Sequence, residues 1–318
     1  MPAYACDLAA VRAATERLKG AVHRTPVLTC STLDRRAGRR LFFKCENLQK
    51  VGAFKYRGAC NAVRKLTDAE AAKGVVTHSS GNHAQALALA ARERGIPAYI
   101  VMPKTAPQVK RAAVEGYGGQ VTLCEPNLAA REQAANELVE RTGATLIPPF
   151  DHPDVIAGQG TVALELLEDV PGLDALVVCV GGGGLLAGCT VAAKGVKPAV
   201  RVFGAEPSGA DDAARSKVAG AWLPQTGPDT IADGLLTSTG QLTWPIIRDL
   251  VERVFTVTDD EIRAAMRLVW ERMKLIVEPS GAVGAAVALG EAFKALPGLE
   301  KVGVVFSGGN VNLDKLWW

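Results

Sequence analysis

The stretch ALVVCVGGGGLLAG (residues 175–188) indicates the class of fold most directly. Its first six residues are all apolar, as expected of a parallel strand that is buried on both faces of a sheet. Four glycines follow, and they allow the backbone to turn tightly and to approach a ligand closely before a helical segment begins. The amides of such a turn and the positive end of the helix suit a phosphate group, although a glycine-rich turn without a ligand is an alternative.

The glycine turn differs from two common nucleotide-binding motifs. It lacks the GK[ST] ending of a P-loop, which disfavours ATP hydrolysis, and it is not a GxGxxG sequence in a first βα turn. An oxidoreductase that binds a nicotinamide nucleotide at this turn remains a competing hypothesis. A catalytically silent binding protein that has kept the fold is another.

Short apolar runs alternate with alanine-rich helical patterns around the turn, which predicts an α/β fold with parallel-rich twisted sheets flanked by helices. The predicted strands are 41–45, 74–77, 98–102, 121–124, 175–180, 200–204 and 302–306. The predicted helices include 83–94, 127–142, 156–169 and 184–194. A capping box at Thr258–Glu261 predicts a further helix that reaches about Lys274. The run 74–147 alternates by itself, so we expect a small sheet inserted into a domain built from both chain ends.

Composition narrows the class of protein. The length of 318 residues, 48% of them hydrophobic, favours two domains or one domain with a large insert. The net charge is only +3 and no run of Lys and Arg is long, which argues against a nucleic-acid-binding face. No uninterrupted apolar stretch approaches ~20 residues, so we expect no membrane span. Seven scattered cysteines, an odd number with no CxxC pair, indicate reduced thiols and a cytoplasmic protein.

One lysine stands in an unusual setting. Lys55 lies in the sequence VGAFKYRG (51–58), between aromatic residues and flanked by glycines. Burial would lower the pKa of its amine and make it a nucleophile able to condense with an aldehyde. Taken alone, a surface lysine in a loop is the simpler interpretation, because most lysines are exposed.

Two further polar segments follow predicted strands. THSSGNHA (77–84) places hydroxyl and amide groups where a strand ends and a helix begins, and such groups either cap the helix or bind a carboxylate. FSGGN (306–310) follows the last predicted strand. Open α/β sheets bind ligands at the carboxyl ends of their strands, so both segments are candidates for a ligand site.

Taken together, these segments resemble the fold-type II pyridoxal-phosphate enzymes (tryptophan synthase β-like fold), in their serine racemase and serine/threonine dehydratase branch. The ordered motifs are FKCENLQKVGAFKYRGA (43–59), SSGNHAQA (79–86), VIAGQGT (155–161), GGGGLLAG (181–188), EPSGADDA (206–213), TIADG (230–234), TWPIIRDLV (243–251) and SGGN (307–310). The resemblance covers nearly the whole chain and is closest to the metal-binding, racemase-like members. It implies a large cofactor-binding domain of residues 1–66 and 152–318. A small inserted domain of residues 74–148 would move over the substrate.

The resemblance also implies roles for individual residues. Lys55 would carry pyridoxal phosphate on its amine and act as a proton acceptor on one face of the substrate. Phe54 would pack beside the cofactor ring, and Asn82 would hydrogen-bond the 3-hydroxyl of that ring. Ser307 would meet the pyridine nitrogen, with Glu278 near the ring. The phosphate would rest on the amides of the glycine turn, which comprises Gly181, Gly182, Gly183, Gly184 and Leu185.

For the substrate, the resemblance implies a carboxylate-binding loop formed by Ser79, Ser80, Gly81, Asn82 and His83. Racemisation needs a proton acceptor on each face of Cα, and Ser80 matches the serine that serves the second face in racemase-like members. A helix-cap hydroxyl is the alternative for Ser80, because a serine is a poor base unless neighbours lower its pKa. This chain has Phe150 and Thr237 at two positions near the substrate where some racemase-like members have different, polar side chains.

Glu206 and Asp212, with the carbonyl of Ala210 between them, resemble the divalent-cation site of the same branch. Mg²⁺, and likewise Ca²⁺ or Mn²⁺, prefers oxygen ligands and accepts waters for the remaining positions. A solvated acidic loop is the alternative, and Asp211 is adjacent without being in a ligand position. The ion would be structural or activating rather than catalytic.

The resemblance therefore implies β-elimination of L-serine and L-threonine to a 2-oxo acid and ammonia, with serine racemisation as a second activity. Dehydration of threo-3-hydroxyaspartate is an alternative within the same class of enzyme. The implied partners are a small amino-acid substrate and a second copy of the chain in a homodimer. Some racemase-like members also bind ATP as an effector at a subunit interface, and no motif in this chain marks such a site.

Overall fold

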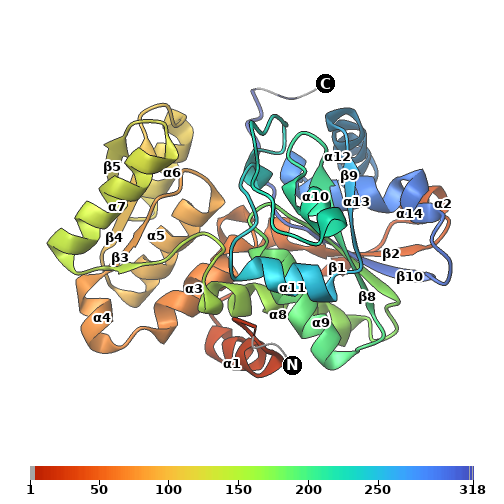
Figure 1. Cartoon of the computed structure of the whole chain (residues 1–318), viewed down its shortest axis with the longest axis horizontal. Helices are drawn as coiled ribbons and strands as arrows, with labels where there is room; N and C mark the ends of the chain where they lie inside the picture. Colours follow the sequence, from red (N-terminus) through yellow and green to blue (C-terminus); the bar gives the residue numbers. More distant parts are fainter. Residues whose placement is uncertain (1–3, 315, 317) are drawn as a thin grey trace.

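The computed structural model describes residues 4–314, 316 and 318. These residues form two parallel-rich sheets in separate lobes (Figure 1). The six-stranded sheet has the order β1-β2-β10-β7-β8-β9, and the four-stranded sheet has the order β5-β4-β3-β6. β1 is antiparallel to β2, and every other pairing between the described strands is parallel. We call the four-stranded sheet with helices α4–α7 the small lobe, and the remainder the large lobe.

The elements have the following bounds. The strands are β1 Val27–Leu28, β2 Arg40–Cys45, β3 Val75–Thr77, β4 Ala98–Pro103, β5 Gln120–Cys124, β6 Thr145–Leu146, β7 Ala175–Cys179, β8 Arg201–Pro207, β9 Arg253–Val257 and β10 Lys301–Phe306. The α-helices are α1 Leu8–Leu18, α2 Ser31–Ala37, α3 Lys55–Lys65, α4 Asp68–Lys73, α5 Asn82–Arg94, α6 Gln108–Gly116, α7 Leu128–Thr142, α8 Pro153–Asp169, α9 Gly184–Val196, α10 Asp212–Ala219, α11 Thr243–Leu250, α12 Asp259–Met273, α13 Pro279–Leu289 and α14 Glu291–Lys294. Short 3-10 helices are η1 Glu46–Leu48, η2 Lys50–Gly52 and η3 Asp233–Leu235.

The predicted α/β class is confirmed, and each of the seven predicted strands overlaps an observed strand. The capping box before α12 is also confirmed, since the Thr258 and Glu261 side chains each accept a hydrogen bond from the other's backbone amide. The prediction missed β1 and β9, which lie at the two edges of the six-stranded sheet, and the two-residue β6 at one edge of the four-stranded sheet. β1 has only two residues, and exposed side chains at Arg253 and Thr256 interrupt the apolar pattern of β9.

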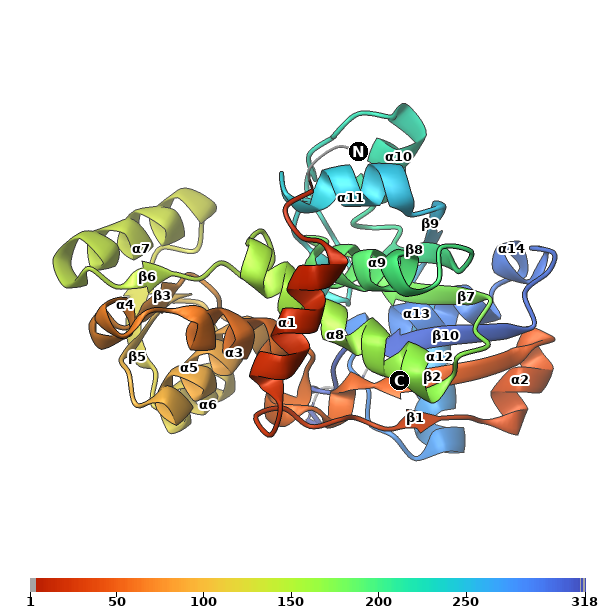
Figure 2. The same cartoon turned by 90° about the horizontal axis from the view of Figure 1, so that it is seen from below.

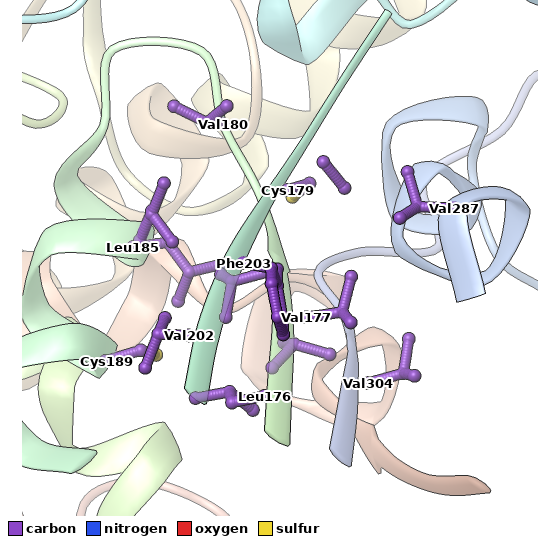
Figure 3. Close-up of a cluster of buried hydrophobic side chains, with 14 of the residues drawn as sticks. Leu176, Val177, Cys179, Val180, Leu185, Cys189, Val202, Phe203, Val287 and Val304 are labelled. Carbon is purple, nitrogen blue, oxygen red and sulfur yellow. The ribbon is translucent and has the colours of Figure 1, made fainter. Parts of the chain in front are cut away.

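The core of the large lobe surrounds β7, whose five residues are all buried. Figure 3 shows Leu185 and Cys189 of α9 on one side of the neighbouring strands β7 and β8, and Val287 of α13 on the other side. Helices therefore cover both faces of the sheet, which explains why the strand sequence is apolar throughout rather than alternating.

The chain leaves the large lobe once and returns to it. All four strands of the small lobe lie between residues 75 and 146, whereas the six-stranded sheet takes strands from both sides of that segment. α3 packs against α5 of the small lobe and α8 of the large lobe, and it lies between the two sheets (Figure 2). The exact domain boundaries therefore remain a prediction.

A buried network of charges fixes the first turns of α3. The guanidinium of Arg57 is fully buried and donates two hydrogen bonds of 2.8 Å to Glu46 and bonds of 2.7 and 2.8 Å to Glu165. Lys44 adds a second buried cation, with its Nζ 2.6 Å from Glu165. Thr25 donates its hydroxyl to Glu46 over 2.5 Å. Two cations and two carboxylates thus satisfy one another where water is excluded, which is the condition for burying charge.

We predict that Arg57→Met destabilises the protein by about 3–5 kcal/mol, because it leaves Glu46 buried without its cation. Urea unfolding of the cofactor-free protein, followed by circular dichroism, measures the change. Glu125→Ala is the matched control, since both side chains of its ion pair with Lys104 are 61% exposed and such a pair should add little to stability. Equal losses in the two variants would contradict the prediction.

Candidate active site

The turn before α3 holds Lys55 against the loop that follows β10. Val51 and Gly52 adopt left-handed backbone angles, with φ of 55° and 69°. Ala53 forms an antiparallel bridge with Gly308, and the backbone amide of Phe54 donates to the carbonyl of Ser307 over 3.0 Å. Lys55 is then the first residue of α3, so its backbone is fixed by contacts on its N-terminal side.

The amine of Lys55 points into the protein. Its Nζ donates a 2.6 Å hydrogen bond to the carbonyl oxygen of Pro149, and it lies 5.1 Å from the centroid of the Phe54 ring. Burial lowers the pKa of the amine to about 8, so an appreciable fraction is the neutral nucleophile near neutral pH. A surface lysine, the simpler interpretation of the sequence, is therefore wrong for Lys55.

Ser307 lies beside a thiol that the sequence analysis did not assign to the site. Both Ser307, after β10, and Cys179, at the end of the neighbouring β7, are buried. Burial raises the pKa of the Cys179 thiol to about 11, although the nearby Ser307 lowers it, so the thiol stays protonated. The group available to a pyridine nitrogen at Ser307 is therefore a neutral hydroxyl with a neutral neighbour.

A buried carboxyl group joins three segments of the site. Glu278 accepts hydrogen bonds from the Asn82 side-chain amide, over 2.9 Å, and from the backbone amide of Asn310, over 3.0 Å. The Asn310 side chain in turn donates to the Asn82 Oδ1 over 2.9 Å and to the Val51 carbonyl over 2.7 Å. Gly308 is required there, since a Cβ on it would lie 2.5 Å from Glu278 Oε1. Burial raises the pKa of Glu278 to about 8.

The glycine turn fits a phosphate group. No amide from Gly181 to Leu185 donates a hydrogen bond to an acceptor among the described residues, so five donors at the start of α9 are free. Gly183 has a φ of 89°, and a Cβ on Gly182 would lie 2.3 Å from the ring of Phe150. The turn therefore needs glycines for its packing, and it keeps its amides unpaired for an anion.

The predicted substrate loop opens α5. Gly81 is the N-cap residue of that helix and no side chain caps it, so the helix-cap alternative for Ser80 is not supported. Ser80 is half-buried, and its hydroxyl has no hydrogen-bond partner among the residues that the structure describes. His83 is buried, and its Nε2 lies 2.9 Å from the carbonyl oxygen of Ile147. Burial, and next the nearby Lys55, lowers the pKa of His83 to about 3.

The predicted metal ligands meet away from Lys55, at the start of α10. Glu206 accepts hydrogen bonds from the amides of Ala213 (3.0 Å) and Ala214 (2.8 Å), and burial raises its pKa to about 8. Asp212 is also buried and close enough to raise that pKa further. The described residues contain no group of three or more His, Cys, Asp and Glu side chains suited to a metal, so a cation would rely on two carboxylates, a carbonyl and water.

Asp211 differs from its two acidic neighbours. Its carboxylate lies 2.8 Å from the Arg215 guanidinium in a half-exposed ion pair. The carbonyl oxygen of Ala210, by contrast, accepts no hydrogen bond from any described residue. The oxygen atoms left available for a cation therefore favour Glu206, Ala210 and Asp212 over Asp211 as ligands.

The structure brings most of the predicted cofactor residues together, and it adds residues that sequence reasoning missed. Lys55, Phe54, Ser307, Asn82 and Glu278 are joined by the contacts above. The added residues are Pro149, Cys179 and Asn310, and Phe150, which the sequence analysis placed near the substrate, packs on the glycine turn. Asn310 stands in the quoted SGGN motif, whereas nothing in the sequence around Pro149 signals that its carbonyl holds a lysine.

The comparisons agree with this geometry. The family model described as "Pyridoxal-phosphate dependent enzyme" matches residues 18–308. A serine racemase of Arabidopsis thaliana is 53% identical over 99% of this chain and 96% of its own length. The structure of maize serine racemase superposes with a TM-score of 0.97 at 49% identity, covering 99% of this chain and 96% of that one. The processed form of a threonine deaminase from Solanum lycopersicum superposes with a TM-score of 0.91 at 36% identity, covering 97% of this chain and 85% of that one.

We predict that the rate at which cofactor-free protein combines with pyridoxal phosphate rises with pH and levels off above about 8. The lowered pKa means that Lys55 loses its proton there, and below that pH the neutral amine falls about tenfold per unit. Stopped-flow absorbance measures the rate, and Lys55→Ala should abolish the absorbance change. A midpoint near 10.5, the ordinary value for lysine, would contradict the burial of this amine.

Proposed function

The chain belongs to the family of pyridoxal-phosphate dependent enzymes. From that premise we propose that it eliminates the β-hydroxyl and amino groups of L-serine and L-threonine. We propose that it also racemises serine. One observation carries the proposal: the amine of Lys55, with its lowered pKa, is held by the Pro149 carbonyl in a chain whose glycine turn has free backbone amides. Its serine racemase and threonine deaminase relatives support the choice of substrates.

The residues described above would hold the cofactor as follows. The amides of residues 181–185 would bind the phosphate, Lys55 would carry the aldehyde carbon, and Asn82 would meet the 3-hydroxyl. When bound, pyridoxal phosphate withdraws electrons from Cα of the substrate and so makes its proton acidic. Asn82 is held by Glu278 and Asn310, which supports a fixed orientation for its side chain.

Ser307 supports elimination over transamination. A carboxylate at this position would keep the pyridine nitrogen protonated, whereas the Ser307 hydroxyl and the protonated Cys179 thiol next to it carry no charge. The negative charge that develops on the substrate is then less delocalised. Prompt loss of the β-hydroxyl is favoured under those conditions.

Racemisation would use two proton acceptors on opposite faces of Cα. Lys55 would serve one face, and the half-buried Ser80 hydroxyl, free of any cap hydrogen bond, would serve the other. The loop 79–82 would hold the substrate carboxylate through its amides and hydroxyls at the start of α5. Small-lobe movement would close this loop over the substrate, and an ion pair of 2.8 Å between Lys110 of α6 and Asp233 of η3 already links the lobes.

We propose Mg²⁺ or a similar divalent cation at Glu206, Ala210 and Asp212, as a support for the glycine turn. Asp212 accepts hydrogen bonds from the backbone amide and hydroxyl of Thr239, and the next amide, of Gly240, donates to the carbonyl of Gly182 over 3.2 Å. A cation that fixes Asp212 would therefore also fix the segment on which the glycine turn rests.

A homodimer, ATP as an effector and a cytoplasmic location remain predictions. Exposed apolar side chains support an interface near residues 47 and 276, since Leu48 and Ile276 are 46% and 48% exposed and the Asn47 side chain donates to the Ile276 carbonyl.

Among the described residues, every helix is too short or too polar to span a bilayer. Dehydration of threo-3-hydroxyaspartate stays the alternative reaction, and nothing observed favours an oxidoreductase.

We predict that the cofactor-loaded protein converts L-serine to pyruvate and ammonia, L-threonine to 2-oxobutyrate, and part of the L-serine to D-serine. Ser80→Ala should reduce D-serine formation by at least about tenfold, because it removes the proton acceptor on one face. Pyruvate formation should change far less, since elimination needs only the Lys55 face. Enzymatic pyruvate detection and chiral chromatography of the same samples measure both products.

Lys55→Ala is the control for this experiment and should abolish both products. A Ser80→Ala protein that still makes D-serine at the original rate would contradict the two-acceptor mechanism. A wild-type protein that acts on hydroxyaspartate alone would favour the alternative substrate.

We predict that Mg²⁺ raises the melting temperature of the wild-type protein and of Asp211→Asn, but not of Asp212→Asn. Binding to the folded state alone stabilises it, by about 2.7 kcal/mol when the ion is at 100 times its Kd. Differential scanning fluorimetry with and without EDTA measures the shift. The Asp211 variant is the matched control because it removes an adjacent carboxylate that is paired with Arg215.

A further inference from the structure

His83, in the predicted substrate loop, has an unused hydrogen-bond acceptor. Its Nε2 lies 2.9 Å from the carbonyl oxygen of Ile147, which can only accept, so Nε2 must carry the proton. The other ring nitrogen, Nδ1, then has a free lone pair. His83 is 2% exposed, and its Nδ1 is buried with no hydrogen-bond partner among the described residues. A buried polar atom without a partner is unusual in a folded protein and calls for a ligand.

The imidazole stands next to the catalytic amine. The segment Ile147–Pro149 holds both groups, since the Ile147 carbonyl accepts from His83 and the Pro149 carbonyl accepts from Lys55 Nζ over 2.6 Å. Two successive prolines restrict this segment, because their rings fix φ. Among the charged groups, Lys55 lowers the pKa of His83 most, as expected of a nearby amine.

The ring is unsuited to the substrate carboxylate. Burial and the neighbouring Lys55 lower the pKa of His83 and keep it uncharged, and the lone pair on Nδ1 would repel a carboxylate oxygen. The prediction that the substrate loop binds the carboxylate can therefore hold for the backbone amides and hydroxyls of residues 79–82, but not for the His83 side chain. A substrate group that donates a hydrogen bond would satisfy Nδ1.

We propose that Nδ1 of His83 accepts the hydrogen bond of the substrate's β-hydroxyl and so selects β-hydroxy amino acids, with serine and threonine preferred over substrates that carry a carboxylate at that position. The inference rests on the proposed function, whose substrates already have this hydroxyl. His83 takes up no proton in this role. It orients the leaving hydroxyl relative to Cα, and an amino acid without a β-donor leaves the buried nitrogen unpaired.

Two variants of His83 test the roles of the two ring nitrogens independently. The amide of glutamine reaches the position of Nε2, so His83→Gln keeps the contact with Ile147 and loses the acceptor at Nδ1. The amide of asparagine overlays Nδ1, so His83→Asn keeps the acceptor and loses the Ile147 contact. L-Serine and β-chloro-L-alanine are compared as substrates, because the chloride has no proton to donate to Nδ1 and so cannot make the proposed hydrogen bond.

We expect His83→Gln to lower the ratio of kcat/KM for L-serine to that for β-chloro-L-alanine by about tenfold, the effect of one lost hydrogen bond. His83→Asn should keep this ratio within about threefold of the wild-type value. A ratio that is unchanged in His83→Gln, or that falls equally in both variants, would overturn the inference. If the wild-type protein acts on neither substrate, the proposed function itself fails.

A spectroscopic measurement tests the same contact without turnover. The chain has only four histidines, so ¹⁵N-histidine NMR of the cofactor-loaded protein can be assigned with the two variants. We expect the Nδ1 of His83 to be unprotonated at neutral pH. Its resonance should shift on addition of L-serine to the Lys55→Ala protein and not on addition of L-alanine. A protonated Nδ1, or equal shifts with both amino acids, would contradict the proposal.

Discussion

The position of Lys55 depends on a hydrogen-bonded junction around the buried carboxyl of Glu278. That carboxyl accepts from Asn82, at the start of α5, and from the amide of Asn310, after β10. Asn310 extends the junction to the carbonyl of Val51, in the turn that leads into α3. Three segments that are far apart in the sequence therefore meet at one group. Just beyond Lys55, Arg57 anchors the first turns of α3 from the other side.

Burial shifts the titratable groups of the site toward their uncharged forms. It lowers the pKa of Lys55 and His83 and raises that of Glu278 and Cys179. The protein thus supplies few fixed charges where the substrate reacts, and the phosphate of the cofactor would meet neutral amide dipoles. Electrostatic effects are strong in such a dry site, so the protonation of each neutral group decides what it can bind. His83 illustrates this, because the hydrogen bond at Nε2 makes Nδ1 an acceptor.

The sequence predicted the elements whose signal is local and missed the contacts that depend on folding. β7 and the glycine turn were recognisable because burial on both faces and close backbone packing each restrict the residue types. The charge network of Arg57 was not, because its partners Glu46 and Glu165 are 11 and 108 residues away, and single charged residues normally lie at the surface. The acceptor for Lys55 is a backbone carbonyl, at Pro149, and every residue type has one.

Buried charge also explains how a cation distant from the reacting atoms could affect catalysis. Without a counter-ion, Glu206 and Asp212 form a buried pair of like charges, and each opposes ionisation of the other. A divalent cation would remove that repulsion and hold Asp212 against Thr239, whose neighbour Gly240 donates to Gly182. The connection to the glycine turn would consist of the hydrogen bond from Thr239 to Asp212, the peptide bond between Thr239 and Gly240, and the hydrogen bond from Gly240 to Gly182. Because an amide cradle binds an anion well only when its donors are already aligned, rigidity of this segment would appear as cofactor affinity.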